Sequence, residues 1–351
     1  MGRRGTAGIL IGVTLLGLLL RIVYFQGFVG KDDLTYIDDG YRLARGDYLP
    51  RPNEWDVRIG IIAPLALAIR VFGLHDWSVA LYPLCLSLLS LPLIYTLGKT
   101  LYSERVGLIA ALLLACFPQD IHYATVAYSV LPSVFYASLA ILLAYRSRRP
   151  RTRRARLRLA AGAGLAMAVS YLTYEGQAVF AAICLLAIWS DRARDKPWRL
   201  LLVAAVPLCA VVVEGLIYWR LTGDPLFRFV ALHTHSDLMR GTGLAPYALQ
   251  WLVALLNPGY PQTFFYGMLT LWAVLMMRGR PLRAEDRLLA TWLLGGFVFF
   301  AFAVISLRPL IPLLQVEPYI LHGLAYPAIL LVARALYETY PVAKTRRSAG
   351  T

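Results

Sequence analysis

The stretch of the chain best suited to chemistry is residues 31–48, KDDLTYIDDGYRLARGDY. It holds a quarter of all acidic residues, 5 of 20: Asp32, Asp33, Asp38, Asp39 and Asp47. Neighbouring carboxylates that are partly withdrawn from water raise one another's proton affinity, so one of them can act as a base near neutral pH. The alternative is a solvated segment in which Asp and Gly only cap a helix or form a turn.

Three charged residues outside this stretch also lie where a charge is costly. Arg58 opens a short apolar segment, RIGIIAPLALAIRVF, where it could bind an anionic headgroup through its forked donors or only snorkel to the interface. Glu175 in TYEGQ lies between two apolar runs, and Glu214 lies within one. Acids in such places are exposed, paired or functional. Glu214 could be a paired structural acid or could line a cavity.

No cofactor or metal site is predicted. The four cysteines lie in apolar runs without a CxxC pair. The acidic pair, and His233 with His235, lack a convincing ligand spacing, although a divalent metal stays an alternative. His122 is interpreted as a hydrogen-bonded structural residue beside a helix end, with a substrate contact as the other possibility.

The composition is that of an integral membrane protein. Hydrophobic residues make up 59% of the chain, charged residues 16%, and the mean hydropathy is +0.60. The net charge of +15 comes from basic residues in short loops, which indicates membrane topology and excludes nucleic-acid binding. The first apolar segment is long enough to span and is interpreted as an uncleaved anchor.

The apolar runs predict an all-α polytopic protein with about ten transmembrane helices. The predicted spans are residues 7–25, 78–98, 106–123, 130–146, 157–172, 175–190, 199–220, 261–277, 288–307 and 318–337. With the amino terminus in the cytoplasm, 24 of the 35 Lys and Arg residues lie inside. The short apolar segments 58–72 and 247–256 are then placed as helices in the outer interface. The external face consists of loop 26–77, the turns 123–129 and 173–177, loop 221–260 and the turn 308–316.

A set of residues at fixed spacing in loop 26–77 carries a family resemblance: Asp32, Asp33, Tyr36, Gly40 and Gly46. In this pattern the chain resembles GT-C type glycosyltransferases that use polyprenyl-phosphate sugars, such as protein O-mannosyltransferases and lipid A aminoarabinose transferases. The resemblance continues through Arg58, Pro64, Phe72 and Gly73, and it is clearest over residues 8–232. The chain departs from the family after Pro118, where many members carry an Asp about a dozen residues on.

The resemblance implies a catalytic base at Asp32, with Asp33 as its neighbour, and a lipid phosphate bound by Arg58. Further substrate contacts are expected among Tyr36, His122, Glu175, Arg228, His233 and His235. The chemistry agrees, because transfer from a lipid phosphate needs a base for the acceptor hydroxyl and a cation for the phosphate. It needs no acid for a leaving group that is already a stable anion.

The sequence therefore predicts a multi-pass glycosyltransferase of the cell membrane, inner or plasma, with its active site on the external face. It would move a sugar, with inversion, from a polyprenyl-phosphate carrier to a hydroxyl of a lipid, glycan or protein. Residues 1–232 would form the catalytic module, and residues 233–351 the variable C-terminal helices and cytoplasmic tail. The alternatives are a transporter or lipid flippase, or a non-catalytic subunit with the same fold.

Overall fold

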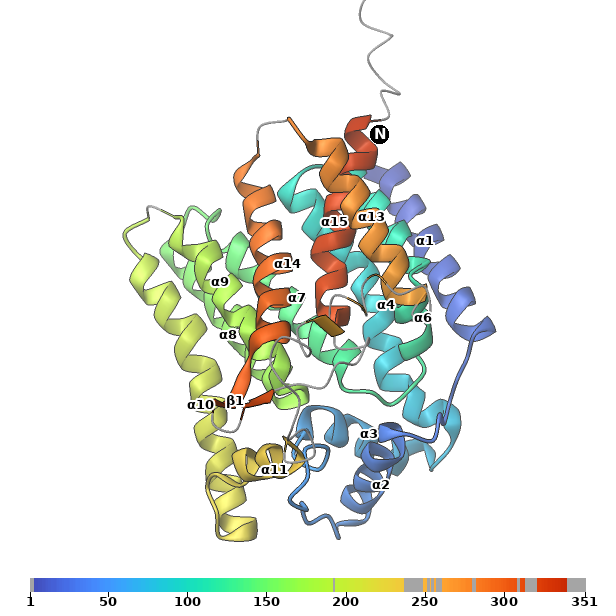
Figure 1. Ribbon diagram of the computed structural model, residues 1–351, viewed down its shortest axis with the longest axis vertical. Coiled ribbons are helices and arrows are strands. Elements are labelled where there is room, and N and C mark those ends of the chain that lie inside the picture. The colour runs from blue at the N-terminus through green and yellow to red at the C-terminus, as the bar shows by residue number, and fades with distance from the viewer. Residues whose placement is uncertain are drawn as a thin grey trace, which may run out of the picture.

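Long helices run side by side, and a group of short helices crosses one end of them (Figure 1). The computed structural model describes residues 3–191, 193–236, 249–250, 253, 256, 261–279, 282–307, 310–312 and 321–339. The longer helices are α1 (Arg3–Val23), α4 (Asp76–Leu101), α5 (Glu104–Ala115), α7 (Val130–Arg146), α8 (Arg153–Thr173), α9 (Phe180–Trp189), α10 (Lys196–Thr222), α13 (Pro261–Met277), α14 (Ala284–Phe302) and α15 (His322–Thr339). Each of the ten predicted spans overlaps one of them, so the all-α prediction is confirmed.

Two predicted spans need correction. The span 106–123 is broken into α5 and the short helix α6 (Pro118–Tyr123), because the residue before a proline is held extended: Phe117 has φ −71° and ψ 114°. The span 288–307 ends early, since α14 stops at Phe302 and the β-branched segment that follows forms strand β1 (Val304–Leu307). This strand pairs antiparallel with β2 (Leu310–Pro312). The predicted interfacial segment 247–256 and the turn 308–316 lie largely outside the described residues.

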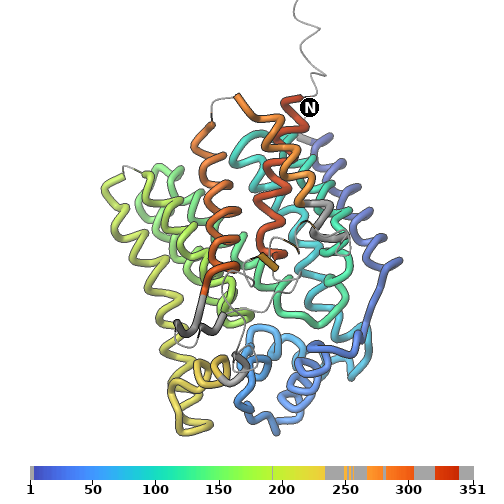
Figure 2. Tube along the Cα trace, in the orientation of Figure 1, coloured from blue at the N-terminus to red at the C-terminus, as the bar shows by residue number. Residues whose placement is uncertain are grey.

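The long helices have the character of membrane spans. Three described segments, Arg4–Val23, Asp76–Leu101 and Lys196–Thr222, are each long and apolar enough to cross a bilayer. The α10 helix runs down to the level of the short helices (Figure 2), and its outward face presents large apolar side chains such as Leu208 and Val212. The chain is thus an integral membrane protein, whose apolar outer surface suits lipid.

The acid-rich stretch forms a helix, α2 (Asp32–Arg45), and is not a loop. Asp32 and Asp33 lie in its first turn, where negative charge is favourable to the helix dipole. Gly46 ends the helix in the left-handed conformation, φ 84°, and its N–H donates to the carbonyls of Arg42 and Leu43. The helix buries Tyr36 and its neighbours against a second short helix, α3 (Ile59–Phe72). This fixes which carboxylates face the protein.

The predicted helix at 58–72 is present as α3 (Ile59–Phe72), and it lies beside α2 at the same end of the bundle (Figure 1). Its start packs directly on the end of α8. A Cβ on Gly60 would lie 2.7 Å from the backbone nitrogen of Thr173, so only glycine permits this approach. The contact brings Arg58, the residue before α3, next to the turn that follows α8.

The short helices α2, α3 and α11 (Phe227–Ser236) define what we call the α2–α3 end, and the amino terminus lies at the opposite end (Figure 1). This separation agrees with the predicted topology, in which the acidic segment and the amino terminus lie on different sides of the membrane. The assignment of the α2–α3 end to the outer side stays a prediction.

A fully buried ion pair ties the helices together within the bundle. Arg21 Nη2 donates to Asp120 Oδ2 at 2.5 Å, and Arg21 Nε donates to Ser87 Oγ at 2.6 Å. His322 Nε2 lies 3.3 Å from the other carboxylate oxygen of Asp120. Because burying one charge alone would be costly, the pair stabilises the contact of α1, α4, α6 and α15.

Candidate active site

Arg58 lies at the centre of the polar contacts at the α2–α3 end. Its guanidinium is buried and donates to Glu175 Oε1 from Nη2 (2.6 Å) and to Glu175 Oε2 from Nε (3.3 Å). Nη2 also reaches Glu54 Oε2 at 3.2 Å, and Nη1 donates to Tyr36 Oη at 2.6 Å. The guanidinium lies 4.7 Å from the centre of the Tyr174 ring. Arg58 is therefore held from several sides and is not a snorkelling anchor.

Arg228, on α11, binds the same carboxylate. Its Nη2 donates to Glu175 Oε2 at 2.9 Å, and its Nη1 donates to Glu214 Oε1 at 2.6 Å. It also donates to the carbonyls of Val57 (3.0 Å) and Tyr171 (3.0 Å), and it stacks 4.4 Å from the Tyr171 ring. Both interpretations of Glu214 hold, because it pairs with Arg228 and also lines a cavity.

These contacts form what we call the arginine cluster: Glu54, Arg58, Glu175, Glu214 and Arg228. Three acids and two bases alternate through it, for a net charge of −1. Burial by itself lowers the pKa of Arg58 and Arg228, but the carboxylates around them raise it above its ordinary value. Both guanidinium groups are thus charged at any physiological pH, as a binding site for an anion requires.

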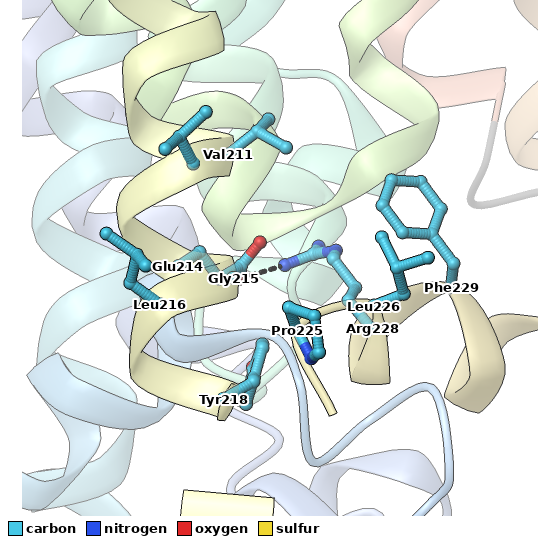
Figure 3. Close-up of a pocket in the computed structure, with 10 residues that line it drawn as sticks. Val211, Glu214, Gly215, Leu216, Tyr218, Pro225, Leu226, Arg228 and Phe229 are labelled. Atoms are coloured by element: carbon cyan, nitrogen blue, oxygen red, sulfur yellow. Dashed lines mark hydrogen bonds and ion pairs between the residues drawn. The ribbon is translucent and has the colours of Figure 1, made fainter. Parts of the chain in front are cut away.

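An apolar groove opens beside Arg228, between α10 and α11 (Figure 3). Its volume is about 280 Å³, and Val211, Val212, Leu216, Leu226 and Phe229 are among its lining residues. The ion pair of Glu214 and Arg228 lies at its inner wall, marked by the dashed line in Figure 3. The groove therefore places apolar surface next to a buried cation.

The two acids at the start of α2 have different surroundings. Asp33 is fully buried, and its carboxylate accepts hydrogen bonds from the backbone N–H groups of Val29 (2.8 Å), Gly30 (3.3 Å) and Lys31 (2.7 Å). Asp32 is half-buried and forms no hydrogen bond or ion pair within the part of the chain that the structure describes. Asp33 fixes the turn before α2, whereas the carboxylate of Asp32 is free to meet a substrate.

Tyr36 links Asp32 to the arginine cluster. It lies one helical turn after Asp32, so the two side chains project from the same face of α2. Its hydroxyl contacts Ser129 Oγ at 3.1 Å in addition to Arg58. Burial raises the pKa of Tyr36 to about 12, even though Arg58 opposes this shift. Tyr36 therefore stays protonated, and its hydroxyl ties Arg58 to α2.

A second acidic pair holds the loop that carries Arg58. The guanidinium of Arg51 bridges Asp39 Oδ1 (3.0 Å) and Asp56 Oδ2 (2.7 Å). Burial and the neighbouring Asp56 carboxylate raise the pKa of Asp39 to about 7. Tyr218 Oη donates to the carbonyl of Val57 at 3.1 Å. Residues 51–58 are thus pinned to both α2 and α10.

The structure brings together four of the predicted substrate-binding residues, Tyr36, Arg58, Glu175 and Arg228. Within the described residues, the contacts of Arg58 and Arg228 do not include a histidine. His122 packs edge-on against Tyr123 on α6, near Lys31, and His233 is exposed on α11. The side chain of His235 lies outside the described residues.

No group of three or more His, Cys, Asp and Glu residues is placed to hold a metal ion among the residues described here. Five carboxylates at the α2–α3 end are instead paired with arginines: Asp39, Glu54, Asp56, Glu175 and Glu214. Metal dependence stays untested, as does the prediction that no cofactor is needed.

Sequence reasoning missed Glu54, which pairs with Arg58, and the Arg51–Asp56 pair. Glu54 stands four residues before Arg58, the spacing of a local ion pair, which was a usable signal. It also missed Arg21 and the ion pair that Arg21 forms with Asp120. Each of these two residues interrupts an apolar segment, which indicates a buried partner.

Comparison with known proteins supports the resemblance seen in the sequence. A family model described as dolichyl-phosphate-mannose-protein mannosyltransferase matches residues 61–219. No curated protein sequence matches the chain.

Solved structures match over almost the whole chain. ArnT from Cupriavidus metallidurans in the apo state has a TM-score of 0.69 at 19% identity, covering 96% of this chain and 61% of that one. The same protein bound to undecaprenyl phosphate gives 0.68 at 18% identity, covering 97% and 61%. The Archaeoglobus fulgidus oligosaccharyltransferase in the apo form gives 0.61 at 16% identity, covering 96% and 51%. These similarities confirm the GT-C-like fold. The chain spans about three fifths of ArnT and half of the oligosaccharyltransferase.

Proposed function

We propose that this protein transfers a sugar from a polyprenyl-phosphate carrier to an acceptor hydroxyl. One observation carries the proposal: two buried, permanently charged arginines converge on Glu175, and one of them, Arg58, also donates to Tyr36. Tyr36 lies one helical turn after Asp32, an aspartate that has no partner in the described structure. The comparisons support it. The description of the matching family model names dolichyl-phosphate-mannose, and a structure of the similar protein ArnT contains undecaprenyl phosphate.

Arg58 and Arg228 would bind the phosphate of the donor. A guanidinium offers parallel N–H donors that fit two oxygens of a phosphate, and both arginines present such donors to the place that Glu175 occupies. The apolar groove between α10 and α11 would take the first part of the isoprenoid chain, since it lies beside Arg228 and is lined by aliphatic and aromatic side chains.

Asp32 would act as the general base. It takes the proton from the acceptor hydroxyl, the hydroxyl oxygen attacks the anomeric carbon, and the bond from that carbon to the phosphate oxygen breaks. The electron pair leaves with the phosphate, where Arg58 and Arg228 stabilise the added negative charge. Attack from the side opposite to the phosphate inverts the anomeric centre. Asp33 positions Asp32 by holding residues 29–31 and does not touch the reacting atoms.

The acceptor would be a hydroxyl of a lipid, a glycan or a protein. The site would face the outside of the cell membrane, because the α2–α3 end lies opposite the amino terminus and the basic loops favour a cytoplasmic amino terminus (Figure 1).

Replacing the base tests the proposal. Asp32→Asn keeps the size of the side chain but cannot accept a proton, so transfer should fall by about 10²- to 10⁴-fold while undecaprenyl phosphate still binds. Asp38→Asn, on the exposed side of α2, is the matched control and should retain the parental rate. Purified full-length protein would be assayed with labelled polyprenyl-phosphate sugars. Parental transfer by Asp32→Asn would contradict the assignment of the base.

A further inference from the structure

The two arginines of the cluster already hold an anion of their own, the carboxylate of Glu175. Its two oxygens accept from Arg58 at 2.6 and 3.3 Å and from Arg228 at 2.9 Å. A carboxylate that joins two guanidinium groups in this way fills the place where two oxygens of a phosphate would bind. Glu175 and the phosphate of a donor therefore compete for the same N–H groups.

Both arginines have partners other than Glu175 that would hold them in place. Arg58 still contacts Glu54, Tyr36 and the Tyr174 ring. Arg228 still contacts Glu214, two backbone carbonyls and the Tyr171 ring. Removing the carboxylate would free donors on both arginines at a single place and would leave the guanidinium groups aligned.

The charges favour exchange over simultaneous binding. With Glu175 in place the cluster carries two positive and three negative charges, a net −1. A phosphodiester brings one more negative charge, which would give −2 in a largely buried site. If Glu175 leaves, two positive charges face Glu54, Glu214 and the phosphodiester, and the net charge returns to −1. Like charges this close repel strongly where water is scarce.

Glu175 is also placed to move. It lies on the 3₁₀ turn η1 (Glu175–Val179) between α8 and α9, and 14% of its side chain is exposed, against 2% for Arg228. Rotation of its own side chain towards solvent would release both arginines.

We propose that Glu175 occupies the phosphate site of the free protein, that the donor phosphate displaces it, and that its return helps to expel the lipid phosphate after transfer. The inference rests on the proposed function, in which Arg58 and Arg228 bind that phosphate. The product is a phosphate monoester, with a charge of about −1.5 to −2 at pH 7, and so it would bind the arginines more tightly than the donor does. A competing carboxylate makes its release faster.

The test measures binding of undecaprenyl phosphate to the full chain in detergent, with uncharged undecaprenol as the lipid control. Glu175→Gln should bind undecaprenyl phosphate at least about tenfold more tightly, the size expected when charge-assisted hydrogen bonds become available. Binding of undecaprenol should not change. Transfer by this variant should be inhibited by lower concentrations of undecaprenyl phosphate.

Glu54→Gln and Glu214→Gln are matched controls, because each removes the same charge from one arginine only. Their gain in affinity should be smaller than that of Glu175→Gln. Glu175→Asp, which shortens the side chain but keeps its charge, should give an intermediate gain and serves if the Gln variant does not fold.

Two results would overturn the inference in different ways. If Arg58→Ala and Arg228→Ala weaken binding but neither Glu175 variant strengthens it, Glu175 is a structural partner and the proposed function stands. If neither alanine variant weakens binding, the phosphate does not bind at the cluster, and the proposed function fails together with the inference.

Discussion

Gly60→Ala should weaken donor binding although Gly60 touches no substrate in the proposed mechanism. The new Cβ would lie 2.7 Å from Thr173 N and 2.8 Å from Thr173 Cα, both backbone atoms that cannot rotate away. Restoring an ordinary contact of 3.4 Å requires a shift of about 0.7 Å between the start of α3 and the end of α8.

That shift acts directly on the arginine cluster. Arg58 precedes α3 and Glu175 follows α8, and the Nη2–Oε1 distance between them is 2.6 Å. A displacement of this size would stretch this contact beyond a normal hydrogen bond. It would also misalign Arg58 with Arg228, which donates to the carbonyl of Tyr171 near the end of α8, so the two guanidinium groups would no longer meet at one phosphate. Overpacking of this kind costs about 1–3 kcal/mol, and a misplacement of about 1 Å can lower a rate about 10²-fold. We expect undecaprenyl phosphate to bind about tenfold more weakly and transfer to fall by at least as much.

Binding and transfer would be compared with those of Gly12→Ala. Gly12 lies in α1, where an added Cβ meets nothing within 4 Å, so alanine should leave both properties at the parental level. Thermal unfolding in detergent would show whether either variant has lost its fold. Parental binding and transfer by folded Gly60→Ala would refute the argument that this close approach positions Arg58.

Three other changes have defined outcomes. Arg58→Lys keeps the positive charge but loses the parallel N–H donors of the guanidinium, and Arg58→Ala loses both. Affinity for the donor should therefore fall from Arg to Lys to Ala, and equal affinities would show that Arg58 does not bind the phosphate. The pKa of Asp39 is raised from 3.8 to about 7, so the folded protein holds a proton that the unfolded chain loses, and thermal stability should fall as pH rises from about 4 to 7. Asp39→Asn should flatten this fall, and an unchanged pH profile would contradict the shift. An impermeant thiol reagent should label a cysteine at Asp47 in intact cells but not one at Arg151, and labelling at Arg151 alone would reverse the topology.

The sequence was sufficient to predict the helical segments because the length and hydropathy of a span are local properties. It failed where a local backbone rule overrides hydropathy, as at Phe117 and Pro118, where an apolar run breaks into two helices. The acid-rich stretch shows the same limit. Its charge suggested a solvated loop, whereas the burial of Tyr36 and Gly40 against α3 makes it a helix.

The site was predictable in its members but not in its contacts. Arg58 and Glu175 were singled out because each charge stands beside apolar runs, yet 117 positions separate them and no pattern in the sequence pairs them. Asp32 and Asp33 are identical and adjacent, so only the structure separates the free carboxylate from the one that accepts three backbone hydrogen bonds. Adjacent side chains project from a helix in different directions, so their roles depend on which face of the helix packs against the protein.

Two buried polar groups join distant segments of this protein, and their exposure and charge distinguish their roles. Arg21 and Asp120 are fully buried, and their charges cancel. Arg21 also donates a hydrogen bond to Ser87. Such a neutral pair has no charge to offer a ligand, so it serves to hold helices together. The arginine cluster has an excess acid, and that acid is partly exposed on a short turn. When another anion binds the two arginines, displacing the excess carboxylate costs little free energy, because the arginines keep a negative partner. Of these two groups, the arginine cluster is therefore the one suited to exchange an internal anion for a substrate.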